Sequence, residues 1–259
     1  MQTIFGIHAV DGVLRSHPKS VQRLWVQQGR EDKRIGALLE LAKNQGVPVA
    51  RLPRTDLDGM VDGRHQGVVA EIADAPAHGD STQSNLLTEK DLLQRVEQAP
   101  DPVLILVLDG VTDPHNLGAC LRSADAAGVD AVVVPKDKSA DLGPTVRKVA
   151  CGAAETVPFV RVTNLSRFLK ALKERDVWLY GAAGESQKTL YDNDLTGSLA
   201  LVMGAEGGGL RRLTREQCDF LVKLPMAGSV SSLNVSVAAG VCLFEVVRQR
   251  HAGALAGPA

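Results

Sequence analysis

A polar cluster lies inside the apolar stretch 224–245, which begins like a buried strand and ends like a buried helix. The cluster consists of Ser229, Ser231, Ser232 and Asn234. Hydroxyl and amide groups at the end of a strand can hydrogen-bond a ligand, and the same groups also serve as helix caps and turn formers. The cluster alone therefore leaves a binding site and a helix N-terminus as alternatives.

Two further stretches of this kind come earlier in the chain. "LDGVTDPHNLGACLRSADAAG" starts at residue 108 and "LVMGAEGGGL" starts at residue 201, and each follows an apolar strand-like run. Both contain Gly, Ser or Asn residues that let the backbone approach a ligand closely. Because ligands of open α/β sheets bind beyond the carboxyl ends of the strands, the three stretches are candidates for one common site.

The glycine-rich stretch from residue 201 matches neither of the two common phosphate-binding patterns. It is not GxGxxG and not GxxxxGK[ST], in which backbone groups hold pyrophosphate. A ligand poor in phosphate is therefore favoured. A tight turn before a helix explains the glycines equally well. In the stretch from residue 108, Asp109 and Asp113 are typical turn formers and Asn116 is a typical helix cap.

Taken in order, the three stretches closely resemble the three motifs of the SpoU/TrmH family in the SPOUT class of RNA ribose methyltransferases. The residues that carry the match are Asn116 and Arg122 in motif one, Gly204, Glu206 and Gly207 in motif two, and Leu224, Met226, Ser232, Leu233 and Asn234 in motif three. The match continues in "FGIHAV", in "HQGVVAEI" and over residues 134–165. There the chain is similar to the bacterial subgroup that methylates 23S ribosomal RNA.

This resemblance implies an α/β fold whose C-terminal parallel-sheet domain forms a trefoil knot, one of the rare exceptions to unknotted chains. The threaded segment would be the stretch from residue 224. S-adenosylmethionine would lie bent in the knot and be held mainly by backbone groups, with contacts from Gly204, Leu224, Met226 and Leu233. Such a site suits a cofactor that has no phosphate.

The catalytic residues that the resemblance implies are Asn116, Arg122, Glu206, Ser232 and Asn234. Methyl transfer needs the ribose 2'-hydroxyl oxygen in line with the methyl carbon, and the hydroxyl proton must leave. Arg122, oriented by Asn116, is the candidate proton acceptor, although a free guanidinium with a pKa above about 12 is a poor base. The alternative is that Arg122 holds the target phosphate while water or Glu206 accepts the proton. Ser232 and Asn234 would hydrogen-bond the ribose or the cofactor.

His115 is a second candidate base because it neighbours Asn116. A histidine in a turn that contains proline is more typical of a surface or packing residue. The sequence shows no metal-ligand spacing, and methyl transfer needs no metal.

The elements that must position these residues fall into two predicted domains. Residues 1–73 predict a small α/β unit that opens with a helix and then alternates the strands "RLWVQQG", "VPVARL" and "GVVAEIA" with two helices. Residues 74–87 are aperiodic and predict a flexible linker. Residues 88–250 alternate apolar runs with amphipathic stretches, which predicts a parallel sheet covered on both faces. Residues 251–259 form a tail.

The last helix is predicted to begin near Asn234 as its N-cap. Its apolar positions Val237, Val241, Phe244 and Val246 are predicted to pack against the sheet.

Composition indicates an ordinary globular protein of 259 residues, 44% hydrophobic and 23% charged. Its apolar runs are interrupted and fall short of the roughly 20 residues that span a bilayer, and its start lacks the basic residues of a signal peptide. The four cysteines show neither zinc-ligand nor disulfide spacing. We therefore expect a cytoplasmic protein without membrane contact.

The net charge of -1 gives no sign of a nucleic-acid partner, so the RNA partner depends on the resemblance. The resemblance implies a homodimer that methylates a guanosine in the peptidyl-transferase P loop of 23S rRNA, with the N-terminal domain binding the RNA. The alternatives are methylation of tRNA or of another rRNA nucleotide, and a non-catalytic RNA-binding or ribosome-assembly module. The non-catalytic module is disfavoured because the motif residues are intact, namely Asn116, Arg122, Glu206, Ser232 and Asn234.

Overall fold

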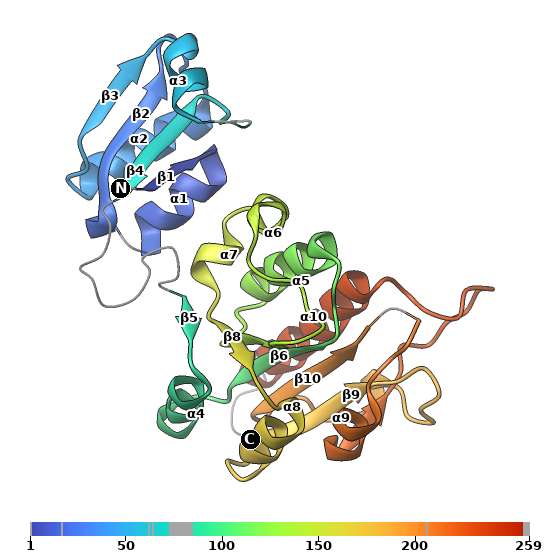
Figure 1. Cartoon of the computed structure of the whole chain (residues 1–259). Coiled ribbons are helices and arrows are strands. Elements are labelled where there is room, and N and C mark those ends of the chain that lie inside the picture. The colour runs from blue at the N-terminus through green and yellow to red at the C-terminus, as the bar shows by residue number, and fades with distance from the viewer. Residues whose placement is uncertain are drawn as a thin grey trace. The chain divides into compact units, whose positions relative to one another are not determined.

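The computed structural model divides into two compact units (Figure 1). It describes residues 2–16, 18–61, 63, 65–72, 85–205 and 207–255. Unit 1 comprises Met1–Asn85 and Cys151–Thr156, and unit 2 comprises Leu86–Ala150 and Val157–Ala259. Most of the predicted linker and the end of the predicted tail lie outside the described residues. No helix in the described part of the chain is long and apolar enough to cross a membrane.

Unit 1 is built on a four-stranded sheet of order β1-β4-β2-β3. The strands are β1 (Gln2–Phe5), β2 (Val21–Gln27), β3 (Val49–Leu52) and β4 (Val68–Ile72). Strand β4 runs antiparallel to β1 and β2, whereas β2 and β3 are parallel. The helices are α1 (Ile7–Ser16), η1 (Pro18–Ser20), α2 (Lys33–Asn44), α3 (Arg54–Met60) and α7 (Ala153–Thr156).

The helix predicted to open the chain is preceded by a strand, so the prediction is wrong at this point. Strand β1 pairs with β4 from Gln2↔Ile72 to Phe5↔Val69. Four residues are too short for a recognisable alternation of apolar and polar side chains. The strand forms because β4, distant in the sequence, supplies its hydrogen-bond partners.

Unit 2 contains a seven-stranded sheet of order β11-β9-β10-β6-β7-β8-β5 in which every pair of neighbours is parallel. The strands are β5 (Leu86–Leu87), β6 (Leu104–Asp109), β7 (Ala131–Pro135), β8 (Phe159–Val162), β9 (Trp178–Ala182), β10 (Leu199–Gly204) and β11 (Phe220–Val222). Strands β6 and β7 are buried along their whole length, as expected of parallel strands covered on both faces. The predicted parallel α/β sheet is confirmed.

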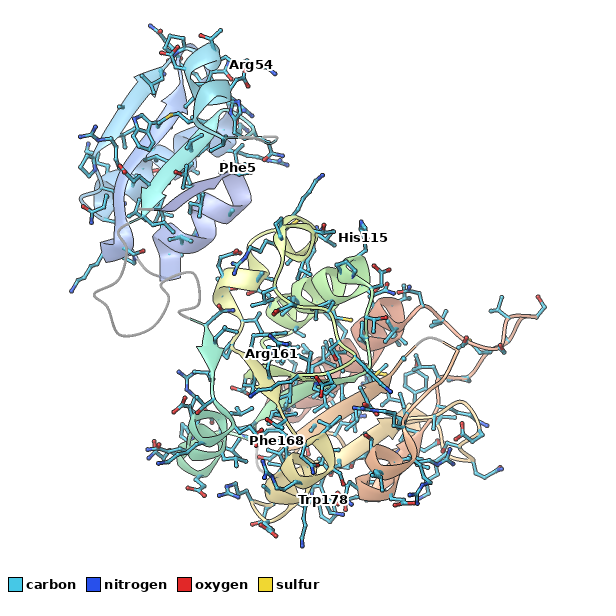
Figure 2. The ribbon with its side chains drawn as sticks, viewed as in Figure 1. Phe5, Arg54, His115, Arg161, Phe168 and Trp178 are labelled. Carbon is cyan, nitrogen blue, oxygen red and sulfur yellow. The ribbon has the colours of Figure 1, made fainter. Side chains whose placement is uncertain are left out.

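The helices of unit 2 cover both faces of this sheet (Figure 1). They are α4 (Glu89–Gln98), α5 (Pro114–Ala126), α6 (Pro144–Ala150), α8 (Leu165–Lys173), η2 (Leu190–Asp192), α9 (Arg212–Gln217) and α10 (Val235–Leu255). Phe168 of α8 (Figure 2) packs in a core cluster with Ile105 and Val107 of β6 and Leu92 of α4. Helix α10 packs against α5 and β10.

Helix α10 begins directly after Asn234, as predicted, but its predicted packing face is wrong at three of four positions. Val246 is buried, whereas Val237, Val241 and Phe244 are 51%, 37% and 50% exposed. The buried residues of this helix are instead Val235, Ala239, Cys242, Leu243, Glu245 and Val246. Apolar residues surround most of the helix, so their spacing does not identify which face meets the sheet.

Helices α5 and α6 approach each other most closely at Gly118. A Cβ atom on Gly118 would lie 2.7 Å from Cβ of Val149 and 2.8 Å from the carbonyl oxygen of Val146. These distances are shorter than normal van der Waals contact. The glycine of motif one is therefore required by helix packing.

We expect Gly118→Ala to lower the free energy of unfolding of unit 2 by about 1–3 kcal/mol, because the added methyl group forces α6 away from α5. Gly36→Ala in α2 is the matched control, since a Cβ there meets nothing within 4 Å. This substitution should raise the free energy of unfolding of unit 1, which contains α2, by about 0.5–1 kcal/mol, because alanine favours the helix more than glycine does. Urea unfolding followed by circular dichroism measures both. Equal effects of the two substitutions would contradict this account of Gly118.

Candidate active site at the carboxyl ends of the central strands

Motifs one and two leave the sheet side by side. Strands β6 and β10 are parallel neighbours, and their last residues, Asp109 and Gly204, are partners in the register. Gly110 follows with a φ of +85°, and a Cβ on it would lie 3.6 Å from Cβ of Ala205. The structure therefore brings the first two candidate stretches together.

The motif-two loop, defined as Ala205 and residues 207–210, turns back on itself directly after β10. Gly209 N donates a hydrogen bond of 3.0 Å to the carbonyl oxygen of Ala205. A Cβ on Gly204 would collide with the returning backbone at Gly209, so only glycine fits there. At Gly207 and Gly208, by contrast, an added Cβ would meet nothing within 4 Å. The turn needs its glycines and also presents open backbone at the strand end.

The sequence context suggested that Asp109 is a turn former, but its side chain has a further role. Its side chain is fully buried at the end of β6. It accepts hydrogen bonds from the backbone N–H of Arg211 at 3.0 Å and from Nε of Arg211 at 2.5 Å, and Nη2 of the same arginine completes the ion pair. The pair links the end of β6 to the residue that follows the motif-two loop.

Motif three returns to motif one at the start of α5. Asn234 donates a hydrogen bond of 2.9 Å from Nδ2 to Oδ1 of Asn116, which is buried in the first turn of α5. Oδ1 of Asn234 accepts from the backbone N–H of Ser236 at 2.9 Å and from its hydroxyl at 2.6 Å. Asn234 thus caps α10 and also contacts motif one.

The remaining predicted residues are less enclosed. Arg122 is exposed on α5. Leu224 and Met226 are half-buried, whereas Ser232 and Leu233 are exposed. The last two belong to the orange-red segment between β11 and α10, which extends away from the sheet in Figure 1. Glu206 lies outside the described residues.

A fourth loop, residues 183–188 after β9, adjoins motif three and was not predicted as part of the site. Ser186 donates a hydrogen bond of 2.6 Å from Oγ to the carbonyl oxygen of Leu221, and Lys223 N donates to the carbonyl oxygen of Lys188 at 3.0 Å. Strand β9 lies between β10 and β11 in the sheet. The order of the strands in the sheet cannot be read from the sequence, so nothing in the sequence indicated that this loop lies next to motif three.

His115 is a surface residue at the start of α5 (Figure 2), with 71% of its side chain exposed. Its backbone N–H donates a hydrogen bond of 2.9 Å to Oδ1 of Asp113, the N-cap residue of α5. The position agrees with the surface alternative for this histidine. Among the described residues, no group of three or more His, Cys, Asp and Glu side chains could hold a metal ion.

Three of the four thiols are poor nucleophiles. Burial raises the pKa of Cys120 and of Cys242 to about 12. Burial, with a smaller contribution from Asp219, raises the pKa of Cys218 to about 12 as well. Since the thiolate is the reactive form, these side chains do not act as nucleophiles at neutral pH.

We expect the free energy of unfolding to fall as the pH rises above about 9, the ordinary pKa of a cysteine thiol. Each raised pKa means that the unfolded chain loses its thiol proton first, so the stabilisation is complete below about pH 9 and declines between about 9 and about 12. Urea unfolding of Cys242→Ala should show a shallower decline than that of Cys151→Ala, because Cys151 is exposed. Parallel pH curves for the two variants would refute the assignment.

Comparison with known proteins places both parts of the chain among RNA-methylating proteins. The SpoU rRNA Methylase family model matches residues 103–244, and the model for RNA 2'-O ribose methyltransferase substrate binding matches residues 3–77. The chain is 60% identical to the 23S rRNA (guanosine-2'-O-)-methyltransferase RlmB of Pseudomonas aeruginosa, over 96% of the chain and 97% of that protein. It is 55% identical to the protein of the same name from Escherichia coli, over 96% of the chain and 99% of that protein.

Solved structures agree with these sequence matches. The SpoU methyltransferase AviRb from Streptomyces viridochromogenes, in complex with the cofactor AdoMet, is 28% identical with a TM-score of 0.68, over 96% of this chain and 90% of that one. A crystal structure of an RNA 2'-O ribose methyltransferase is 25% identical with a TM-score of 0.70, over 96% and 88% of the two chains.

Proposed function

The chain belongs to the SpoU rRNA methylase family, and we propose that it methylates the ribose 2'-hydroxyl of a guanosine in 23S ribosomal RNA. The observation that carries the proposal is the hydrogen bond between Asn234 and Asn116. This bond joins motif three to motif one, and the pairing of β6 with β10 places Asp109 of motif one beside Gly204 of motif two. It agrees with the activity named for relatives that are 55–60% identical over nearly the whole chain.

S-adenosylmethionine is the methyl donor of this reaction, and the strand-end geometry fits it. The cofactor has no phosphate groups, and the open backbone at Gly207 and Gly208 offers uncharged hydrogen-bonding groups. We propose that Gly204, Leu224, Met226 and Leu233 hold it, with the half-buried Leu224 and Met226 against its apolar parts. The trefoil knot stays a prediction that the family resemblance implies.

We propose that Asn116 and Asn234 act as a positioning pair for the ribose. The carbonyl oxygen of the buried Asn116 side chain already accepts from Asn234, which limits rotation of both amides. Such fixed dipoles hold a reacting hydroxyl in line without reorganising during the reaction. Ser232, two residues before Asn234 and exposed, would donate a further hydrogen bond to the ribose or the cofactor.

Arg122 is suited to hold the RNA phosphate next to the target ribose. Its exposed position on α5 lets it reach a large substrate, and a guanidinium binds phosphate through two parallel hydrogen bonds. In this role it would also stabilise the alkoxide that develops on the 2'-oxygen, while water or Glu206 accepts the proton. The alternative is that Arg122 itself removes the proton. This is disfavoured because an exposed guanidinium stays protonated and has no acceptor atom.

We propose that the target is the P-loop guanosine and that residues 1–73 select the RNA. The substrate-binding family model at residues 3–77 supports the second part. The location that fits this substrate is the cytoplasm.

Methyl transfer from labelled S-adenosylmethionine to unmodified 23S rRNA tests the reaction, with ribose-methyl mapping of the product. We expect one P-loop guanosine to be labelled by the wild-type protein. Arg122→Ala should lower the rate by about 10²–10³-fold, the loss typical of a removed charge-stabilising group. Arg122→Lys should recover little, because an ammonium lacks the two-pronged geometry. Near-full activity of the lysine variant would reject both roles of Arg122.

The controls separate the alternatives. Arg95→Ala, an exposed arginine of α4, should leave the rate unchanged. Labelling of unmodified tRNA in place of rRNA would keep the chemistry and overturn the target. Tight RNA binding without transfer to either substrate would favour the non-catalytic module.

We also propose that the chain forms a homodimer through the exposed apolar stripe of α10, defined as Val237, Val241 and Phe244. Their spacing of four and three residues places them on one face of the helix. Three exposed apolar side chains in a row are typical of an interaction surface. A two-fold axis would pack the stripe against its own copy, because such interfaces use the same patch on both subunits.

The combined variant Val237→Ser and Phe244→Ser should therefore run as a monomer in size-exclusion chromatography with light scattering, whereas the wild-type protein runs as a dimer. Leu213→Ser is the matched control, because Leu213 of α9 is equally exposed at 54% but lies outside the stripe. It should leave the dimer intact. A monomeric wild-type protein, or a dimeric stripe variant, would contradict the assignment.

A further inference from the structure

We infer that Asp109 and Arg211 form a clamp that fixes the motif-two loop in the shape that binds the cofactor. The inference rests on the proposed function, because it takes S-adenosylmethionine as the ligand of this loop. Neither residue was among the predicted site residues. Both are assigned here as positioning residues, which act through the loop and not on the reacting atoms.

The clamp is an ion pair between a buried carboxylate and a half-exposed guanidinium, and its three donor groups come from one residue. The Asp109 side chain is fully buried, and the backbone N–H, Nε and Nη2 of Arg211 all point at its carboxylate. A buried carboxylate is costly unless charged and hydrogen-bonded partners compensate it. The position of Arg211 is therefore strongly coupled to that of Asp109, although the arginine side chain is itself 46% exposed.

The clamp closes the loop at both ends. Gly204, directly before the loop, is held beside Asp109 by the pairing of β10 with β6. Arg211, directly after the loop, is held to the side chain of the same Asp109. The hydrogen bond from Gly209 to Ala205 adds a second tie inside the loop. One residue of β6 thus fixes both the departure and the return of the chain.

The loop needs such an anchor because of its own composition. Three consecutive glycines, residues 207–209, have more conformational freedom in the unanchored chain than any other residue type, and ordering them costs entropy. A ligand that had to order the loop would bind more weakly, whereas a loop held in its bound shape loses less on binding. Asp109 itself belongs to motif one and Gly110 follows it directly, so the same pair also ties motif one to the loop.

The carboxylate of Asp109 has no role in proton transfer on this account. It is inaccessible and its oxygens already accept bonds from Arg211. Its predicted effect is on the affinity for the cofactor and on the order of the loop, which distinguishes it from Arg122.

The test uses full-length Arg211→Gln, Arg211→Lys and the double variant Asp109→Asn with Arg211→Gln. Arg212→Gln is the matched control, because Arg212 is the next residue and its ion pair with Glu216 is exposed. Three quantities are measured: amide hydrogen exchange of residues 205–211 in the cofactor-free protein, the dissociation constant of S-adenosylmethionine by calorimetry, and the melting temperature.

For Arg211→Gln we expect exchange in the loop to speed up and the dissociation constant to rise about tenfold, which corresponds to about 1.4 kcal/mol. The rate at saturating cofactor should change far less. Arg211→Lys should keep most of the melting temperature but lose affinity, because an ammonium cannot make the same fork. The double variant leaves no unpaired buried charge, so its melting temperature should recover while its affinity stays low. Arg212→Gln should match the wild-type protein in all three measurements.

Unchanged exchange and affinity in Arg211→Gln would overturn the inference. Recovery of affinity together with the melting temperature in the double variant would also overturn it, because the pair would then serve stability alone. A wild-type protein that binds no S-adenosylmethionine would reject the proposed function, and the exchange rates of the cofactor-free variants would still decide whether the clamp orders the loop.

Discussion

The pairing of β6 with β10 is the constraint on which the site depends. The two strands are separated by about half of unit 2 in the sequence, yet their last residues are partners in a parallel ladder. Parallel strands need long connections, here the segment that contains β7, β8 and β9. Once this pair forms, motif one and motif two leave the sheet at the same point and in the same direction. The ion pair of Asp109 with Arg211 and the close approach of Gly110 to Ala205 both depend on that juxtaposition.

Helix α5 carries this arrangement to motif three. One side of α5 contacts α6 at Gly118, where there is no room for a side chain. Another side contacts α10, where a Cβ on Gly240 would lie 3.6 Å from Oγ of Ser123. Close packing on two sides leaves α5 little freedom to shift. The first turn of this helix holds Asn116, so the position of the asparagine pair follows from helix packing as well as from its hydrogen bond. A glycine of motif one can therefore be essential without touching a ligand.

The sequence was sufficient for the features that depend on local pattern. Apolar runs of strand length predicted the parallel sheet. Two of the stretches predicted to share one site follow strands that are neighbours in this sheet, β6 and β10. The sequence was insufficient wherever the partner is distant in the chain. Strand β1 forms only because β4 supplies its hydrogen bonds. Asp109 resembles a turn residue in the sequence, and only the structure shows that its carboxylate binds Arg211. On α10, apolar residues lie on several sides of the helix, so the sequence could not show which side is buried. The loop 183–188 adjoins motif three only through the order of the strands.

The distribution of charge follows from a site built largely of backbone and amide groups. A phosphate-binding loop would need a lysine or a helix N-terminus directed at the ligand. Here the charges of Asp109 and Arg211 at the end of β6 neutralise each other, and the glycines present uncharged peptide groups. The cofactor's own sulfonium charge would be opposed by cations placed in such a loop. The cation proposed for the chemistry, Arg122, lies instead on the exposed surface of α5, where it can meet the phosphate of an RNA without raising the positive charge around the methyl donor. The near-zero net charge of the chain is thus compatible with an RNA substrate under the roles proposed above, in which one guanidinium meets the phosphate and residues 1–73 select the RNA.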